Sequence, residues 1–340
     1  MSSATQVADA PQPTSPKKRR KLFNLSEGGG APLLVAPTVV LLAVVIGYPV
    51  VKAVFMSFQK DPGLDKATGL FVSGGFAGFS NYTHWLFQQC DLPGGGRASC
   101  PEGSLGAEFW TAMGNTVLFT VISVAIEVVL GMWFAIIMHR KFRGRGLVRA
   151  AILIPWAIPT AVTAKLFFFI FAFNGIANKI LNTHILWTGD AWPARIAVIS
   201  ADVWKTTPFM ALLILAGLQV ISDEVYEAAR VDGASTWQRF TQITLPLVKP
   251  ALMVAILFRT LDVLRIFDLP FILTGGGGGK GDATTTLSIL VIQQIRQGFN
   301  SAAALSTITF LFIFLVAFIF VKFLGANVVE TQDEQRKAAR

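Results

Sequence analysis

Charged side chains inside long apolar runs are the residues of this sequence that could do chemistry. They are Glu127, Lys165, Asp202, Lys205, Arg259, Asp262, Arg265 and Asp268. An ionised group within a lipid bilayer is costly unless it faces water or a partner, so each of these residues marks either a polar pathway or a charge pair that holds helices together. Arg259 and Asp262 are three residues apart, a spacing that allows pairing on one helix face. Arg265 and Asp268 repeat that spacing.

A short segment that begins at Asp202 combines aromatic and polar residues. A solute with apolar faces and a hydroxyl rim needs both kinds of group, and Trp204 and Thr206 follow closely in the sequence. Pro208 predicts a break in the same helix, which membrane proteins tolerate where backbone lines a cavity. The candidate substrate-pathway residues are Asp202, Trp204, Thr206, Arg259, Asp262 and Arg265.

Other reactive patterns are missing from the sequence. The three histidines are scattered without ligand spacing, so no metal site is predicted, and no catalytic constellation can be assembled. The glycine run 275–281 departs from the phosphate-loop pattern at two positions. Cys90 and Cys100 are too few for a disulfide scaffold; they predict one disulfide if their loop faces an oxidising compartment, and two free thiols otherwise.

Six apolar segments are long enough to carry these residues across a bilayer. The chain is 53% hydrophobic and only 14% charged, which favours a membrane protein over a soluble domain. A span needs about 20 mostly apolar residues, and the candidates are 33–58, 110–138, 147–173, 195–221, 248–273 and 303–324. Trp156, between Pro155 and Pro159, indicates a kink in the third. The first is too long for a removed signal peptide.

The distribution of basic residues predicts the orientation. One set of polar segments contains 17 Lys and Arg, namely 1–30, 139–149, 222–249 and 322–340. The opposite set contains 6, in segments 59–108, 174–193 and 275–302. Basic residues favour the cytoplasmic side, so both termini are predicted to be cytoplasmic. The net charge of +9 is therefore mainly a topology signal, which argues against nucleic-acid binding, and the basic run 17–21 is interpreted as an anchor on anionic lipid.

The inner loop between the fourth and fifth spans predicts a helix, a turn and a second helix. Residues 224–231 are good helix formers with acids in the first turn. Gly233 is placed to end this helix in a left-handed conformation. Ser235 and Gln238 form a capping-box pattern that starts the second helix.

This loop also carries a family pattern, Glu227-Ala228-Ala229, Gly233, Ile243 and Leu245-Pro246. The spacing resembles the EAA loop of the membrane subunits of bacterial ABC importers. The resemblance implies an all-α polytopic membrane protein of six transmembrane helices, with the type I ABC importer permease fold and a cytoplasmic coupling helix. It also implies that the partner ATPase docks on Glu227, Ala228, Ala229, Asp232 and Gly233. The alternative is an amphipathic surface helix that only connects two spans.

Further segments resemble the carbohydrate branch of that family, which includes the maltose and glycerol-phosphate permeases. They are Asn115-Thr116 and residues 142–146, 153–159 and 265–275. The sequence is most similar to the first permease subunit of actinobacterial trehalose importers. The resemblance implies a basic cytoplasmic tail (1–30), a permease domain (31–325) with an extracytoplasmic loop (59–108) and a coupling loop (222–250), and a cytoplasmic C-terminal tail (326–340).

The same resemblance implies the partners and the location. We expect a bacterial cell-membrane protein that forms half of a pathway for trehalose or a similar disaccharide, beside a second homologous permease and membrane lipid. An extracytoplasmic sugar-binding protein would deliver the sugar, and an ABC ATPase dimer would bind ATP and Mg, so that this chain needs no cofactor and is not an enzyme. An ion-gradient-driven secondary transporter is the alternative, but such folds usually show inverted repeats with paired broken helices. No convincing repeat is visible in the sequence.

Overall fold

The computed structural model describes residues 31–64, 70–92, 96–276 and 282–338. The basic run 17–21 and residues 277–281 of the glycine-rich run lie outside the described residues. The chain forms two units, residues 1–52 and 53–340. The described part of the first unit is helical from residue 31 to the unit's end at Lys52, with a π-helical turn. Its elements are α1 (Ala31–Leu42), η1 (Ala43–Gly47) and the start of α2 (Tyr48–Met56). The candidate span Val35–Met56 has 22 residues, which is long and apolar enough to cross a membrane.

In the second unit, the first polar segment folds into small antiparallel hairpins around a short helix. The elements are β1 (Gln59–Lys60) paired with β4 (Gly75–Phe76), β2 (Gly63–Leu64) paired with β3 (Phe71–Val72), α3 (Ser80–Leu86), β5 (Gln89–Asp91) paired with β6 (Arg97–Ser99), and the 3₁₀ turn η2 (Leu105–Ala107). The carboxylate of Asp61 accepts hydrogen bonds from the backbone N–H groups of Asn300 (2.6 Å) and Ser301 (3.0 Å). A carboxylate is favourable at this helix N-terminus, so the contact ties the segment to α14 (Phe299–Ala338).

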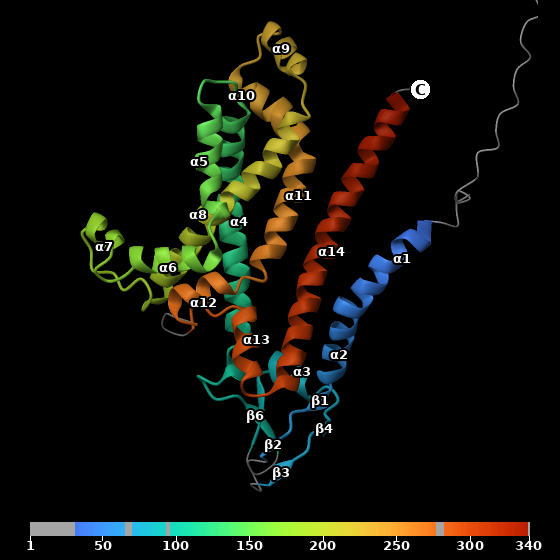
Figure 1. Cartoon of the computed structure of the whole chain (residues 1–340), viewed down its shortest axis with the longest axis vertical. Helices are drawn as coiled ribbons and strands as arrows, with labels where there is room; N and C mark the ends of the chain where they lie inside the picture. The colour runs from blue at the N-terminus through green and yellow to red at the C-terminus, as the bar shows by residue number, and fades with distance from the viewer. Residues whose placement is uncertain (1–30, 65–69, 93–95, 277–281, 339–340) are drawn as a thin grey trace, which may run out of the picture. The chain divides into compact units, whose positions relative to one another are not determined.

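Three long helices form the centre of the second unit. They are α4 (Phe109–His139), α8 (Ala191–Gln219) and α11 (Leu245–Val263), and they run side by side (Figure 1). Small residues bring them close together: a Cβ on Gly217 of α8 would lie 2.4 Å from the Cβ of Ala251 on α11. Membrane helices commonly pack through such small residues, because apolar lipid gives helix association little hydrophobic drive.

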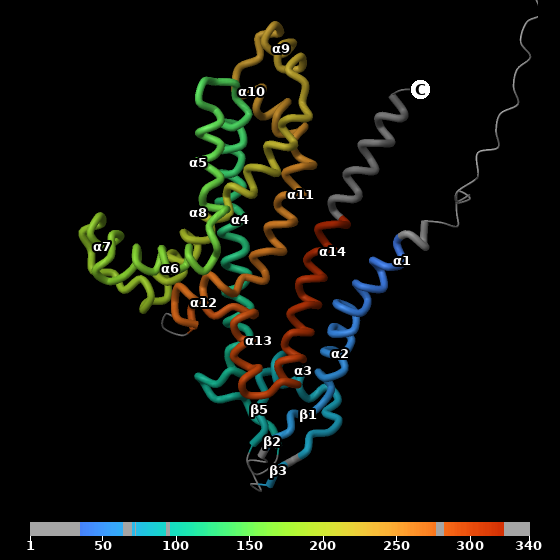
Figure 2. The backbone as a smooth tube through the Cα atoms, viewed as in Figure 1, coloured from blue at the N-terminus to red at the C-terminus, as the bar shows by residue number. Residues whose placement is uncertain are grey.

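The third apolar segment is broken into two helices. α5 (Arg145–Ala157) and α6 (Thr160–Ile170) meet at a bend of 92° (Figure 2). Pro159 explains the position of the break, because a proline pushes the residue before it out of the helical region, and Ile158 is extended with ψ 132°. The span predicted over 147–173 is therefore a bent pair, followed by α7 (Ile176–Leu181).

The structure corrects two predictions about the fourth and fifth spans. α8 runs through Pro208 without a break. Proline removes only one backbone donor, and the hydroxyl of Thr207 supports the adjacent turn by donating to the carbonyl of Val203 (2.6 Å). The segment 248–273 is not one helix, because α11 ends at Val263 and a separate helix follows, α12 (Asp268–Thr274).

Short helices lie at the two ends of this bundle. α9 (Asp223–Val231), α10 (Thr236–Arg239) and the π-helical turn η3 (Phe240–Thr244) lie at one end, and α3 lies at the other (Figure 1). α13 (Leu287–Ile295) packs against α14. In the described residues, five helices are long and apolar enough to cross a membrane, and the bent pair α5–α6 makes a sixth span if it is counted as one.

Candidate functional site

A buried arginine connects the three central helices. Arg259 on α11 is 1% exposed. Its Nε and Nη2 donate to the two carboxylate oxygens of Glu127 on α4, at 2.6 and 2.9 Å. Nη2 also donates to Asp202 on α8 (2.5 Å), and Nη1 donates to Asp262 (2.6 Å). One guanidinium therefore joins carboxylates from three helices, a task that its planar fork of donors suits.

This network extends from the interior to an accessible edge. Glu127 is fully buried and its Oε1 also accepts a hydrogen bond from the hydroxyl of Thr206 (2.7 Å). The side chain of Asp262 is 65% exposed. The charges of buried Arg259, Glu127 and Asp202 compensate one another. Removal of any one of these side chains would leave an unpaired charge in a region of low dielectric constant.

A pocket of about 320 Å³ lies beside Arg259. It is where the break between α5 and α6 faces the break between α11 and α12, and its lining is mainly polar or charged. Five of the six predicted pathway residues line it: Asp202, Thr206, Arg259, Asp262 and Arg265. Trp204 is not among the lining residues; its ring packs instead against Phe167, with the centroids 5.5 Å apart.

Sequence reasoning left three polar lining residues and one supporting residue out of the predicted pathway. Thr160, Lys205 and Asp268 line the pocket. Glu127 is not part of the lining, but its carboxylate accepts a hydrogen bond from Arg259, which is. The ammonium of Lys205 donates to the carbonyl of Ile158 (2.5 Å), which the α5–α6 break leaves free. The sequence marks Glu127, Lys205 and Asp268 as charges within apolar runs. Only the structure, with its two helix breaks, shows which of these side chains lie at the pocket.

The second predicted charge pair is not formed. Within the described residues, no ion pair joins Arg265 to Asp268, and the Nε of Arg265 donates to the carbonyl of Leu261 (3.0 Å). The reason is that α11 ends at Val263, so the two residues do not share a helix face.

The segment that carries α9 and α10 has the predicted helix–turn–helix form. Gly233 has φ +78°, and the N–H of the next residue, Ala234, donates to the carbonyl of Ala229 (2.9 Å). Ser235 and Gln238 exchange both capping-box hydrogen bonds, at 2.8 and 3.3 Å. Each turn of this segment is therefore held by its own local contacts.

The predicted docking residues are mostly accessible on this segment. Glu227, Ala228, Asp232 and Gly233 are exposed, whereas Ala229 is buried. Asp223, in the first turn of α9, forms an ion pair with Lys141 in the loop after α4 (2.7 Å). The hydrogen bond from Lys141 lowers the pKa of Asp223 below its usual value, so the carboxylate stays ionised and links the two loops.

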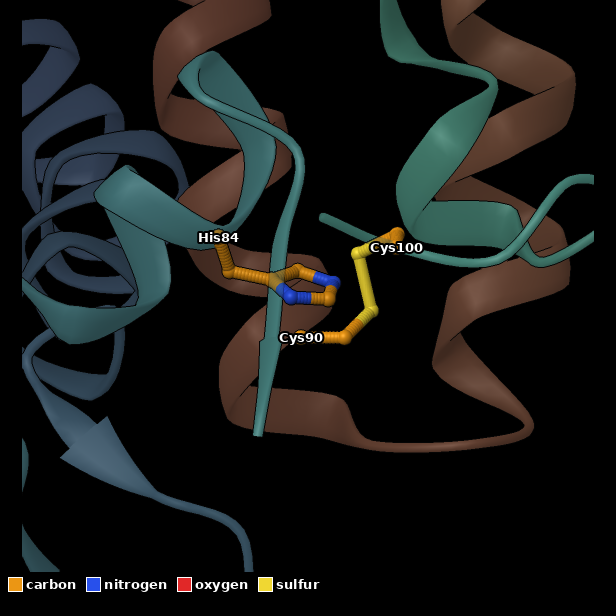
Figure 3. Close-up of side chains that lie close together, drawn as sticks. All are labelled: His84, Cys90 and Cys100. Atoms are coloured by element: carbon orange, nitrogen blue, oxygen red, sulfur yellow. A yellow bond between two sulfur atoms is a disulfide. The ribbon is translucent and has the colours of Figure 1, made fainter. Parts of the chain in front are cut away.

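Cys90 and Cys100 form a disulfide that closes the β5–β6 hairpin (Figure 3). His84 lies beside it, and the ligand atoms of these three residues lie within 4.8 Å of one another, as in a metal site. Both sulfur atoms are already bonded to each other, however, so neither is available as a thiolate ligand. A Cβ on Gly106 would lie 2.7 Å from the sulfur of Cys100, so this position needs glycine.

Comparisons with known proteins extend these observations. Residues 127–330 match the family of binding-protein-dependent transport system inner membrane components. The chain is 37% identical to the trehalose/maltose transport system permease protein MalF of Thermococcus litoralis, over 85% of this chain and 92% of that protein. It is 38% identical to the trehalose transport system permease protein SugA of Mycobacterium tuberculosis, over 86% and 88%.

A solved structure shares the fold. It is a chain of a bacterial alginate ABC transporter in complex with an alginate pentasaccharide-bound periplasmic protein. The TM-score is 0.65 at 20% identity, and the match covers 86% of this chain and 91% of that one.

Proposed function

The chain belongs to the family of binding-protein-dependent transport system inner membrane components, and from this premise we propose that it forms half of the pathway by which an ABC importer takes up trehalose or a similar disaccharide. It is a transport subunit, as its relatives are. In this proposal a separate ATPase dimer binds ATP and Mg. A second, homologous permease completes the pathway, and an extracytoplasmic protein delivers the sugar.

The exposed turn between α9 and α10 is the observation that carries the coupling role. Glu227, Ala228 and Gly233 present their surface at the end of the central bundle, and the ion pair between Asp223 and Lys141 connects this segment to the loop that follows α4. A movement imposed on the exposed face of α9 would therefore reach α4 through the ion pair and α11 through the continuous chain.

The polar pocket beside Arg259 supports a sugar pathway. Hydroxyl groups need both donors and acceptors, and the pocket offers Thr160, Lys205 and Arg265 together with Asp262, whose side chain is largely exposed. The two breaks that frame it, α5–α6 and α11–α12, leave backbone groups close to a cavity, where membrane proteins tolerate them. The relatives' names, which specify trehalose and maltose, favour a disaccharide.

The proposal is tested by uptake of labelled trehalose into vesicles that contain the importer, with and without ATP. Gly233→Pro should abolish ATP-dependent uptake, because proline cannot adopt the positive φ of this turn. Gly103→Pro is the matched control, since Gly103 also has a positive φ and open space around it, but lies in the segment 59–108. Both variants should insert in the membrane in normal amounts.

Two results would contradict the proposal. Uptake retained by Gly233→Pro would remove the coupling role from this turn. Uptake that follows an ion gradient and ignores ATP would favour a secondary transporter. Purification of the tagged chain with its partners would then check the assembly, with an ATPase, a second permease and a binding protein expected by mass spectrometry.

A further inference from the structure

A second cavity, of about 1130 Å³, opens at the end of the bundle that carries α9 and α10. It is distinct from the pocket beside Arg259, because the two share no lining residue. The ends of α4 and α8 form one wall, and α9, α10 and η3 form the other. Trp133, Trp237 and Phe240 provide broad apolar surface in this lining, and both tryptophans are more than half exposed.

The charged residues of this lining are mainly basic. Arg140, Lys141, Arg230 and Arg239 face two acids, Asp223 and Glu227. The ion pair between Lys141 and Asp223 (2.7 Å) uses one charge of each sign. Three arginines then remain against one carboxylate, so the cavity has an excess of positive charge.

Arg239 adds a more specific observation. Its Nε is buried, and no residue that the structure describes accepts a hydrogen bond from it. Among the described residues, this guanidinium makes one hydrogen bond, a 3.2 Å contact from Nη2 to the hydroxyl of Thr236. Buried donors in folded proteins almost always have an acceptor, so this atom favours an anionic oxygen in the cavity.

We propose that this cavity binds an anionic glycerophospholipid, with its phosphate among Arg140, Arg230 and Arg239 and its acyl chains along Trp133 and Phe240. The combination of basic and aromatic walls suits a molecule that is charged at one end and apolar at the other. The cavity lies at the ends of two helices that are long and apolar enough to cross a membrane, which is where lipid headgroups are expected. A free phosphate ion would satisfy the arginines but would leave the aromatic wall uncovered.

The proposed lipid would contact α9 at Arg230. Of the predicted docking residues only Glu227 lines the cavity, whereas Ala228, Asp232 and the turn at Gly233 lie outside it. The binding site therefore goes beyond the proposed transport function, and it can be tested without any transport assay.

The test uses the full chain, purified with the partners that remain bound, washed free of lipid and supplied with an equimolar mixture of phosphatidylglycerol and phosphatidylcholine. Native mass spectrometry measures which lipid is retained. The wild type should retain phosphatidylglycerol preferentially. A basic side chain near an anionic lipid contributes about fivefold in affinity, so Arg140→Gln/Arg239→Gln should lose roughly 25-fold of that preference.

Controls separate a binding defect from a folding defect. Arg143→Gln removes a charge from the same loop but not from the lining, and should keep the full preference. Arg140→Lys/Arg239→Lys keeps both charges and should retain most of the wild-type preference for phosphatidylglycerol. Unchanged phosphatidylglycerol retention in the glutamine double variant would overturn the proposal.

Two further outcomes would also overturn it. Displacement of the lipid by millimolar inorganic phosphate would assign the cavity to a free anion. Retention of lipid by the isolated chain but not by the chain with its partners bound would assign the cavity to a protein interface.

Discussion

At the scale of single residues, Arg259 shows how a membrane interior can contain four charged groups. Its guanidinium donates four hydrogen bonds to carboxylate oxygens from α4, α8 and α11, at 2.5–2.9 Å. A buried ion pair gains little over well-packed apolar residues, but a broken one costs about 3–5 kcal/mol because an uncompensated charge stays buried. The network is therefore a strong constraint on the relative position of these three helices.

Arg259→Lys should destabilise the chain although it conserves the charge. A single ammonium cannot reach Glu127, Asp202 and Asp262 with the geometry of a guanidinium fork. We expect the midpoint of thermal unfolding of the purified chain to fall by several degrees. Arg143→Lys, at an exposed position, should leave the midpoint unchanged. Equal midpoints for both variants would show that the fork geometry is not needed.

Glu108, immediately before α4, predicts a pH dependence. Burial, assisted by the charge of Asp282 and a hydrogen bond to it, raises the pKa of Glu108 to about 7 from an ordinary value of 4.5. The folded state therefore binds this proton more tightly than the unfolded state. Protonated Glu108 therefore contributes fully to the stability of the fold below about pH 4.5, and this contribution is lost as the pH rises through 7.

Glu108→Gln should remove that dependence. Glutamine mimics the protonated carboxyl, so the variant's unfolding midpoint should exceed that of the wild type increasingly from pH 5 to pH 8. Thermal unfolding of both proteins in matched buffers measures the difference. A difference that stays constant over this range would mean that Glu108 does not titrate there.

At the scale of elements, local signals predicted local structure well. The capping box at Ser235 and the glycine turn at Gly233 form as expected, because each depends on contacts within a few residues. Pro159 breaks its span while Pro208 does not, although both lie in apolar runs. The outcome depends on neighbouring helices and on side-chain hydroxyls, which local sequence does not reveal.

The candidate pathway shows the same limit. Charge inside apolar runs identified Asp202, Arg259 and Asp262, but it could not show that Glu127 completes their network from 132 residues away. Trp204 was assigned to the pathway because it is next to polar residues in sequence. On a helix, neighbours in sequence point in different directions, and its ring faces Phe167 instead.

The contact between α8 and α11 gives a prediction at this scale. Gly217→Ala would place a Cβ 2.4 Å from that of Ala251, so the helices must separate, at a cost of about 1–3 kcal/mol. Gly114→Ala on α4 is the matched control, since nothing lies within 4 Å of its added Cβ. That variant should be neutral or slightly more stable, because alanine favours helix. Thermal unfolding of both variants measures the difference in stability, and equal unfolding midpoints would contradict the close packing of α8 against α11.

At the scale of the whole molecule, the apolar spans and the uneven basic residues together determine how the chain lies in a membrane. Five apolar helices and one bent pair have the length to cross it. The segments that contain both termini, α9 and the loop after α4 (139–149) together hold 17 Lys and Arg, against 6 in the opposite segments. Positively charged segments stay preferentially on the cytoplasmic side, so the α9–α10 segment should face the cytoplasm.

Cysteine labelling in intact cells checks this orientation directly. The two native cysteines are bonded to each other and should not react with a membrane-impermeant maleimide. Arg143→Cys, in the loop after α4, should react only after the cells are permeabilised. Gln297→Cys, an exposed position between α13 and α14, should react in intact cells. If Arg143→Cys were labelled from outside as rapidly as Gln297→Cys, the orientation would be wrong, and a coupling role for α9 would be excluded because ATP is on the other side.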